Sequence, residues 1–418
     1  MNRLALSFVA LSNSKDLTAE ADISIILEFI SIFKGSIDFE HHKIEIEALQ
    51  QNTSDIRNNI DSFVKKHSAA NPTMNQINKY FKSLEDNEHF FIMPISDIDK
   101  MDLYIFLSSL KDKKDFEESK KEYLDLFGDL RNEYSIHIFD GNKKYEVGEK
   151  AKDKRICRYC GKSMPEVSFK KVAHAISEAL GNKKIVSLEE CDVCNQKFGD
   201  GIEEDLILYL QLFRSFFGIQ RKKGGNVHFK GENFDIKRDL DGKIKMGYII
   251  DKEQPTKEDL DAPMSLKTYE SINFQNIYRT LAKYATGVMN SNEMKNFKDT
   301  ISWINGEKSI SELPKVAVLT SYAFFDMHPK IMLYIRKTDN INLPYCVCEL
   351  HFVHLTFSII IPLSSMDTNT FINNDEYDTF WKFFKHYQTE GWNFYNFSND
   401  TKRDFRMRIN FEVRNKNN

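Results

Sequence analysis

The sequence lacks several features that would point directly to a function. It contains no apolar run of the roughly 18 residues that a membrane helix needs. It has no glycine-rich phosphate loop, no serine nucleophile elbow and no His-Glu-x-x-His motif. The net charge is only -4, so any surface for a polyanion must be a local patch. The common signatures of phosphate-loop proteins, serine hydrolases and zinc peptidases are therefore missing.

Cysteine is also scarce, but its placement is informative. Four of the six cysteines form two C-x-x-C pairs between residues 157 and 194. The N-terminal stretch MNRLALSFVAL has no A-x-A-like exit, so we expect a buried strand or a first helix there rather than a signal peptide. Without an export signal, paired cysteines favour a metal site over disulfides. We therefore expect a cytoplasmic protein.

A chain of 418 residues is too long for one hydrophobic core, so we expect several domains of the α+β class. Residues 1–135 are predicted to be mostly helical, because segments such as DLTAEADISIILEFISIF and TMNQINKYFKSL place apolar residues at helical spacing. Residues 136–205 form a module around the cysteines, and YSIHIF followed by DGNKKYEV predicts a hairpin at its start.

Residues 206–418 are predicted to form an α+β domain with a regulatory, targeting or oligomerisation role. The stretch NVHFKGENFDIKRDLDGKIKMGYII predicts β-hairpins, and the β-branched and aromatic segments from residue 315 to residue 363 predict strands. Between them, FQNIYRTLAKYATGVM is predicted to be helical.

The two cysteine pairs predict a structural zinc site. Zn²⁺ prefers four soft ligands in a tetrahedron, and a C-x-x-C turn presents two thiolates to one ion. Two such turns close the coordination shell and leave no open position for chemistry. The ligands are Cys157, Cys160, Cys191 and Cys194. A redox dithiol is the alternative, but it would not need two pairs.

The content of this segment resembles the HNH endonuclease family in its zinc-ribbon branch. The residues that carry the resemblance are CRYCG, AHAISEALGN, and ECDVCN running into FGDGIEEDL. The resemblance covers about an eighth of the chain. It implies a ββα-metal module, in which a two-stranded hairpin and a short helix hold one divalent metal ion and the cysteine turns fix the hairpin to the helix.

The resemblance also implies roles for three residues. His174 matches the general base that removes a proton from the attacking water, which suits a side chain whose pKa lies near working pH. Asn195 matches the metal ligand on the helix, and its hard amide oxygen is consistent with Mg²⁺ or Mn²⁺. Asn182, in the connection between the two strands, is expected to orient the His174 ring by a hydrogen bond.

The segment departs from the family pattern at two positions. Many members have an acidic metal ligand directly before the histidine and a proline three residues after it, whereas this chain has Ala173 and Ser177. Another oxygen must then complete the metal shell, and the candidates are Glu178, Asp192, Glu203 and Glu204. Of these we choose Glu203, which has a competing role as partner of Asp200 in a capping box at the start of a helix over residues 202–217.

Local charge favours nucleic acid as the partner. Residues 150–200 contain 11 Lys or Arg against 7 Asp or Glu. Lys170, Lys171, Lys183 and Lys184 lie beside His174 on the two expected strands and are predicted to contact phosphates.

The leading hypothesis is a metal-dependent endonuclease that acts on DNA rather than RNA and resembles bacterial restriction or antiphage effectors. Its expected partner is a second copy of the chain or a defence-system protein. The alternative is a zinc-module regulator that binds nucleic acid or protein without cutting, which Ala173 favours.

Overall fold

The computed structural model describes residues 2–38, 43–69, 74–94, 107, 110, 116–220, 224–239, 241–250, 263–321 and 325–409. It divides into two compact units, residues 1–128 and residues 129–418. Both units combine helices with sheets, which confirms the α+β class. No helix among the described residues is long and apolar enough to cross a membrane.

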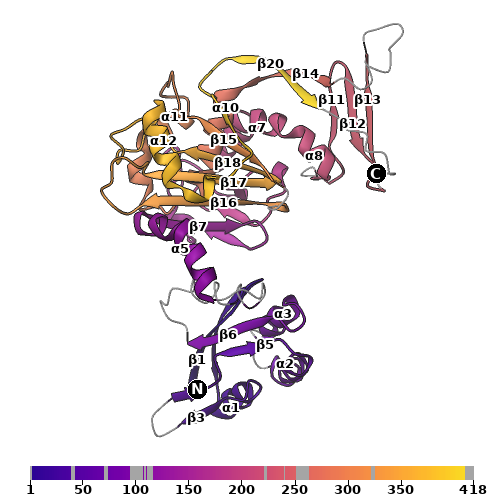
Figure 1. Cartoon of the computed structure of the whole chain (residues 1–418), viewed down its shortest axis with the longest axis vertical. Coiled ribbons are helices and arrows are strands. Elements are labelled where there is room, and N and C mark those ends of the chain that lie inside the picture. The colour runs from indigo at the N-terminus through magenta and orange to yellow at the C-terminus, as the bar shows by residue number, and fades with distance from the viewer. Residues whose placement is uncertain are drawn as a thin grey trace. The chain divides into compact units, whose positions relative to one another are not determined.

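The first unit is built on a four-stranded antiparallel sheet of order β2-β1-β6-β5, with a short β3–β4 pair beside it. Alternate residues of β1, such as Leu6 and Phe8, pack against apolar side chains of three helices, so the helices cover one face of the sheet (Figure 1). The elements are β1 (Asn2–Ala10), β2 (Ser14–Ala21), α1 (Ile23–Ser31), β3 (Ser36–Asp38), β4 (Lys43–Glu45), β5 (Leu49–Gln51), α2 (Ser54–His67), α3 (Asn75–Ser83) and β6 (His89–Pro94).

The prediction that this region is mostly helical is wrong. The helices over 54–67 and 75–83 were expected, but residues 14–21 form strand β2 rather than the first turns of a helix. The helical period in DLTAEADISIILEFISIF belongs only to its second half, where α1 begins at Ile23. Residues 14–21 instead pair along their whole length with β1, from Asn2↔Ala21 to Val9↔Ser14. Pairing with a neighbouring strand decides the conformation here.

The second unit is organised around a six-stranded sheet of order β19-β15-β18-β17-β16-β7, antiparallel throughout. Odd residues of β16, such as Ile331 and Leu333, face the main core with α10, whereas Tyr334 faces Phe384 on the other side. The elements are α5 (Phe116–Glu133, which begins in the first unit), β7 (Tyr134–Asp140), α10 (Phe274–Val288), α11 (Lys298–Ile304), β15 (Val316–Thr320), β16 (Asp326–Arg336), β17 (Cys346–Val353), β18 (Leu355–Ile360), α12 (Asn374–Phe383) and β19 (Trp392–Tyr395).

Beside this sheet lie two further β-structures that share a small core (Figure 1). The three-stranded sheet confirms the hairpins predicted for this region, with Gly242 at a positive φ of 80° in the β12–β13 turn. The second is a two-stranded antiparallel pair formed by β14 and β20. The elements are β11 (His228–Lys230), β12 (Phe234–Arg238), β13 (Ile244–Tyr248), β14 (Met264–Asn273) and β20 (Lys402–Ile409).

The cysteine segment consists of short elements. Strand β8 pairs in parallel with β10, and β10 pairs antiparallel with β9. The predicted hairpin at Asp140-Gly141 does not form, because β7 pairs with β16 of the large sheet instead. The elements are β8 (Tyr145–Val147), β9 (Ala173–His174), a 3₁₀ turn (Glu178–Leu180), β10 (Ile185–Ser187), α6 (Asp192–Gly199), α7 (Ile202–Tyr209) and α8 (Gln211–Phe217).

The predicted boundary at residue 205 does not separate two cores. Phe169, Leu180 and Phe198 of the cysteine segment belong to the same buried cluster as Tyr278 of α10 and Phe357 of β18. The predicted helix over 202–217 is present as α7 and α8, which meet at Leu210. Gly201, without a side-chain cap, precedes α7, so the predicted capping box of Asp200 with Glu203 is wrong.

Candidate active site

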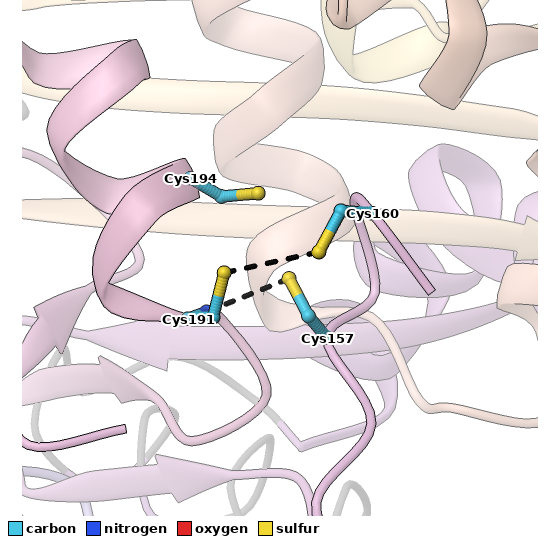
Figure 2. A group of neighbouring side chains, drawn as sticks. All are labelled: Cys157, Cys160, Cys191 and Cys194. Atoms are coloured by element: carbon cyan, nitrogen blue, oxygen red, sulfur yellow. Dashed lines mark hydrogen bonds between the residues drawn. The ribbon is translucent and has the colours of Figure 1, made fainter. Parts of the chain in front are cut away.

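The four cysteine sulfurs converge on one point (Figure 2). All four lie within 4.8 Å of one another, and the sulfurs of Cys160 and Cys191 are 3.8 Å apart. A tetrahedron with Zn–S bonds of about 2.3 Å has edges of about 3.8 Å. Gly161, at φ +70°, closes the first turn by donating from its amide to the carbonyl of Cys157. The arrangement fits a structural Zn²⁺ with four thiolate ligands.

The pKa values of the thiols support the same interpretation. The pKa of Cys157 falls to about 4, chiefly because its sulfur accepts a hydrogen bond from Cys194. The pKa of Cys194 is raised well above its usual range for the same reason, and burial raises the pKa of Cys191 to about 11. Four thiolates this close together repel one another, so a divalent cation would be needed to stabilise them.

Strands β9 and β10 place His174 at the surface edge of the segment. His174 pairs with Val186 across the two strands, and its side chain is 14% exposed. Its Nε2 atom lies 3.2 Å from Oε1 of Glu178, four residues further along the chain. A carboxylate at this position can fix the tautomer and the orientation of an imidazole that acts as a base. Glu178 thus lies beside the predicted base.

Asn182 has a different role from the one expected. Its amide donates to the carbonyls of Ile176 and Ile185, at 2.7 and 2.9 Å, and its oxygen accepts from the amides of Lys184 and Ile185. These four bonds use both donors and both lone pairs of the side chain. The predicted bond to the His174 ring is therefore not formed. Asn182 is fully buried and holds together the connection that follows the His174 strand.

Asn195 lies on the first turns of α6, directly after the last cysteine. The backbone N–H of Asn195 donates to the carbonyl of Cys191, so the cysteine turn and the helix are continuous. Its side chain is half-buried and forms no hydrogen bond within the described part of the chain. Asp192, on the same helix, accepts from the Ser168 hydroxyl and from the amides of Lys170 and Lys171. Asp192 is thus engaged in fixing the chain before β9.

Glu203 lies in the interior rather than at an open site. Its carboxylate is 3.0 Å from Nζ of Lys283, whose ammonium is also 3.1 Å from Glu190. Lys283 and Glu190 are essentially unexposed, at 1% and 0%. Since the lysine accounts for Glu203, we leave this residue out of the metal shell. The two carboxylates also raise the pKa of Lys283 against the effect of burial, so the lysine remains charged.

Helix α10 directly supports the turn that carries Cys157 and Cys160. Arg158, between the first two cysteines, donates to the carbonyls of Thr286 and Met289 and pairs with Glu189 at 2.7 Å. Tyr159 donates from its hydroxyl to the carbonyl of Lys283. The residues between Cys157 and Cys160 are therefore bound to α10 and its C-terminal end.

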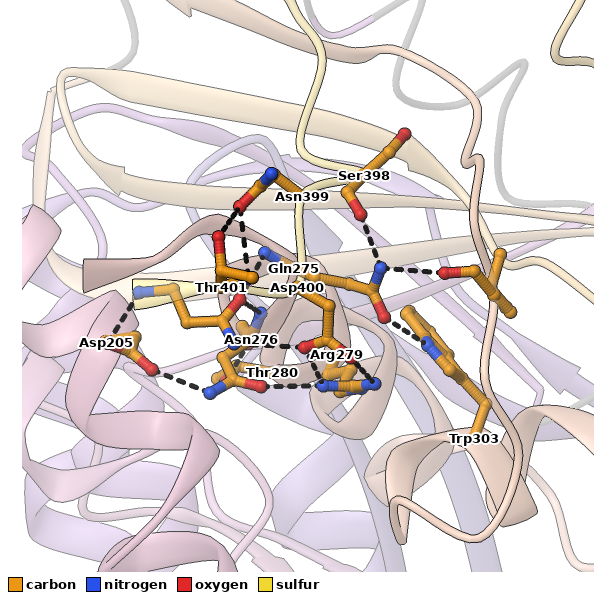
Figure 3. A network of polar contacts seen from close by, with 12 residues as sticks. Asp205, Gln275, Asn276, Arg279, Thr280, Trp303, Ser398, Asn399, Asp400 and Thr401 are labelled. Carbon is orange, nitrogen blue, oxygen red and sulfur yellow. Dashed lines mark hydrogen bonds and ion pairs between the residues drawn. The ribbon is translucent and has the colours of Figure 1, made fainter. Parts of the chain in front are cut away.

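The start of α10 is fixed by a second polar network (Figure 3). Asp205 of α7 accepts from Asn276 at 2.8 Å, and Arg279 forms two bonds of 2.8 and 2.9 Å to Asp400. Trp303 donates to the side chain of Gln275 at 3.0 Å. The helix that carries Lys283 is thus held at both ends.

The four lysines that were expected to contact phosphates are all exposed. They lie in the connections that precede β9 and β10 rather than within the strands. Lys184 donates to the carbonyl of Asn142 at 2.7 Å. No described contact links Lys170, Lys171 or Lys183 through its ammonium to an acidic group. These three side chains are available to a polyanion.

Comparison with known proteins identifies this segment. Residues 157–210 match the HNH endonuclease family. The HNH segment so defined includes the four cysteines, His174, Asn195 and α7, and it covers about an eighth of the chain. No curated protein and no solved structure matches the chain.

Sequence reasoning missed Lys283, Arg158 and Tyr159 as parts of the site. Arg158 and Tyr159 stand between two cysteines, and two large side chains at the tip of a zinc turn could have indicated a docking contact. Lys283 carried a weaker signal, which is its position on the otherwise apolar side of a helix. Its partners Glu190 and Glu203 lie far away in the sequence.

Proposed function

We propose that this chain is a metal-dependent nuclease that hydrolyses phosphodiester bonds, with His174 as the general base. The match of residues 157–210 to the HNH endonuclease family carries the proposal. The four-cysteine site supports it, because it fixes the strand of His174 relative to the helix of Asn195. The substrate is nucleic acid, with DNA preferred to RNA.

In the proposed reaction, the Nδ1 atom of His174 accepts a proton from the water that attacks phosphorus, because Nε2 faces Glu178. Glu178, at 3.2 Å from Nε2, orients the ring and stabilises the imidazolium that forms. A base of this kind is typically worth about 10² to 10⁴ in rate. Asn182 contributes by holding the backbone after His174 in place.

The divalent ion of the proposal, Mg²⁺ or Mn²⁺, would be held by the amide oxygen of Asn195. When bound, such an ion supplies stabilisation of the charge on the scissile phosphate and the leaving oxygen. Asp192 and Glu203 are engaged elsewhere and Glu178 faces His174, so water would complete the shell of the ion. Glu204 is exposed on α7.

A zinc-module regulator that binds without cutting is the second candidate. Ala173 favours it, because this position holds an acidic metal ligand in many HNH endonucleases and its side chain here is 3% exposed, inside the core. Another oxygen ligand must then replace the missing acid for cutting to occur.

Cleavage assays separate the two functions. Plasmid DNA and structured RNA are incubated with the full chain and Mg²⁺ or Mn²⁺. Wild type is compared with Glu178→Gln and with Glu307→Gln, which removes the same charge from an exposed position. The nuclease proposal expects cleavage by wild type and control and a loss of at least tenfold for Glu178→Gln. Binding without cleavage under either metal would favour the regulator. A role in restriction or antiphage defence and a homodimeric state stay predictions.

A further inference from the structure

The β14–β20 ribbon has one apolar and one cationic face. Leu266 and Met407 point inward and pack with the small core of the three-stranded sheet. The residues that alternate with them, Lys267, Arg406 and Arg408, are exposed on the other face. The ribbon is therefore anchored on one side and presents three cations on the other.

The strand register places these cations next to one another. Lys267 lies directly opposite Arg406, and Arg408 lies opposite Ser265, one diagonal step away. Like charges directly opposite each other in an antiparallel pair destabilise the pair. A sheet that kept this face only for solubility would gain from alternating charges.

Nothing in the described part of the chain neutralises the three cations. No ion pair to Lys267, Arg406 or Arg408 is formed by any described carboxylate, although Lys230 and Lys245 of the neighbouring sheet do have acidic partners. Of the two acids of the ribbon, Glu270 lies within the bulge and Asp404 lies beyond it, where Asp404 accepts from Ser271 at 3.3 Å.

The bulge between Lys267 and Ser271 adds an exposed aromatic ring. The Thr268 hydroxyl holds the bulge: it lies 2.7 Å from the carbonyl oxygen of Glu270 and 3.0 Å from that of Phe405, and its one proton is shared between them. Tyr269 at its apex is 64% exposed. A large ring at such exposure, beside unpaired cations, is typical of surfaces that contact nucleic acid.

We propose that the outer face of the β14–β20 ribbon docks duplex DNA and positions it for the HNH segment. A two-stranded ribbon fits the major groove of duplex DNA, and strand β14 with ten residues spans roughly 33 Å. Lys267, Arg406 and Arg408 contact phosphates, and Tyr269 packs against the sugar-phosphate chain. The inference rests on the proposed nuclease function for the identity of the ligand.

The test measures DNA binding separately from cutting. Fluorescence anisotropy follows a labelled DNA duplex, the matching single strand and a duplex RNA over a series of salt concentrations, using the full chain with His174→Ala. The test variant adds Lys267→Gln and Arg406→Gln. The control adds Lys298→Gln and Lys382→Gln, which remove the same charge from exposed positions on α11 and α12. Zinc content and thermal unfolding check that each variant is folded.

The ribbon proposal expects the test variant to bind duplex DNA at least tenfold more weakly, with the salt slope reduced by about two, and the control to stay within twofold of its parent. Equal binding by test and control variants would overturn it, as would a loss confined to single strands or RNA. If the ribbon variant loses duplex binding while wild type cuts nothing, the nuclease function fails and the ribbon stands. If wild type cuts in a His174-dependent way and the ribbon variant binds duplex DNA as its parent does, the ribbon proposal fails and the nuclease function stands.

Discussion

Two groups of cysteines in the same chain have opposite surroundings. The HNH segment has strands of two or three residues, and its four thiols meet within 4.8 Å. Cys346 and Cys348 lie on β17 of the six-stranded sheet, each at most 1% exposed, and burial raises their pKa values well above the usual range. A long strand in a large sheet is held by its neighbours, whereas two-residue strands need a metal and buried ion pairs.

The largest expected effect comes from removing a zinc ligand. Cys191→Ala leaves three thiols and should abolish zinc binding. The segment then loses the roughly 10–16 kcal/mol of binding free energy that a structural zinc contributes to small modules. Metal analysis should find no zinc, and limited proteolysis should cut within residues 157–210. The matched change Cys348→Ala should keep one zinc per chain at a stability cost of about 1 kcal/mol. A zinc-replete Cys191→Ala chain would show that the comparison is wrong.

Removing Lys283 should have the next largest effect. Lys283→Met leaves Glu190 and Glu203 without their shared cation in the interior, which should cost about 3–5 kcal/mol in the free energy of unfolding. Urea denaturation measures the loss. Adding Glu190→Gln and Glu203→Gln should recover much of it, because no unpaired charge remains. The exposed control Lys382→Met should change stability by less than about 0.5 kcal/mol. If Lys283→Met left the free energy of unfolding unchanged, the ion pairs of Lys283 with Glu190 and Glu203 would not support the HNH segment.

Asn182→Ala should have a smaller effect that is again confined to the HNH segment. It leaves two carbonyls and two amides without their side-chain partner, at a cost of about 1–3 kcal/mol. Hydrogen exchange should show faster exchange at Lys184 and Ile185 but not in β17. Asn342→Ala, at an exposed loop position, is the control. Unchanged exchange in the Asn182→Ala chain would contradict the role that the contacts give this amide.

The large sheet has a pH dependence of its own. Glu349 is buried, and hydrogen bonds from His351 and His386 hold its pKa far below the usual 4.5 against the effect of burial. Because the folded-state pKa is depressed, this stabilisation is complete above about pH 4.5 and decreases as the pH falls below it. Thermal unfolding between pH 7 and pH 3, followed in wild type and Glu349→Gln, should show a smaller acid-induced loss in the variant. Parallel curves for the two proteins would contradict this.

The convergence of the four cysteines and the placement of His174 on a strand could be predicted from the sequence. Both depend on residues that lie close together in the chain. The hairpins of β11–β13 and the strands of the large sheet were also predictable, from turn residues and β-branched runs. The pairing of β7 with β16 and of β2 with β1 could not be, since period and propensity do not choose a partner strand. The buried ion pairs of Lys283 could not be predicted for a similar reason, because its partners Glu190 and Glu203 are distant in sequence.

The central claim is that the zinc-held segment presents His174 as a base to a phosphodiester. The most direct test compares cleavage of plasmid DNA by wild type and His174→Ala with Mg²⁺ or Mn²⁺, at equal zinc content and equal thermal stability. We expect wild type to cut and the variant to be slower by about 10² to 10⁴. Cleavage at the wild-type rate by a zinc-replete, folded His174→Ala protein would contradict the account.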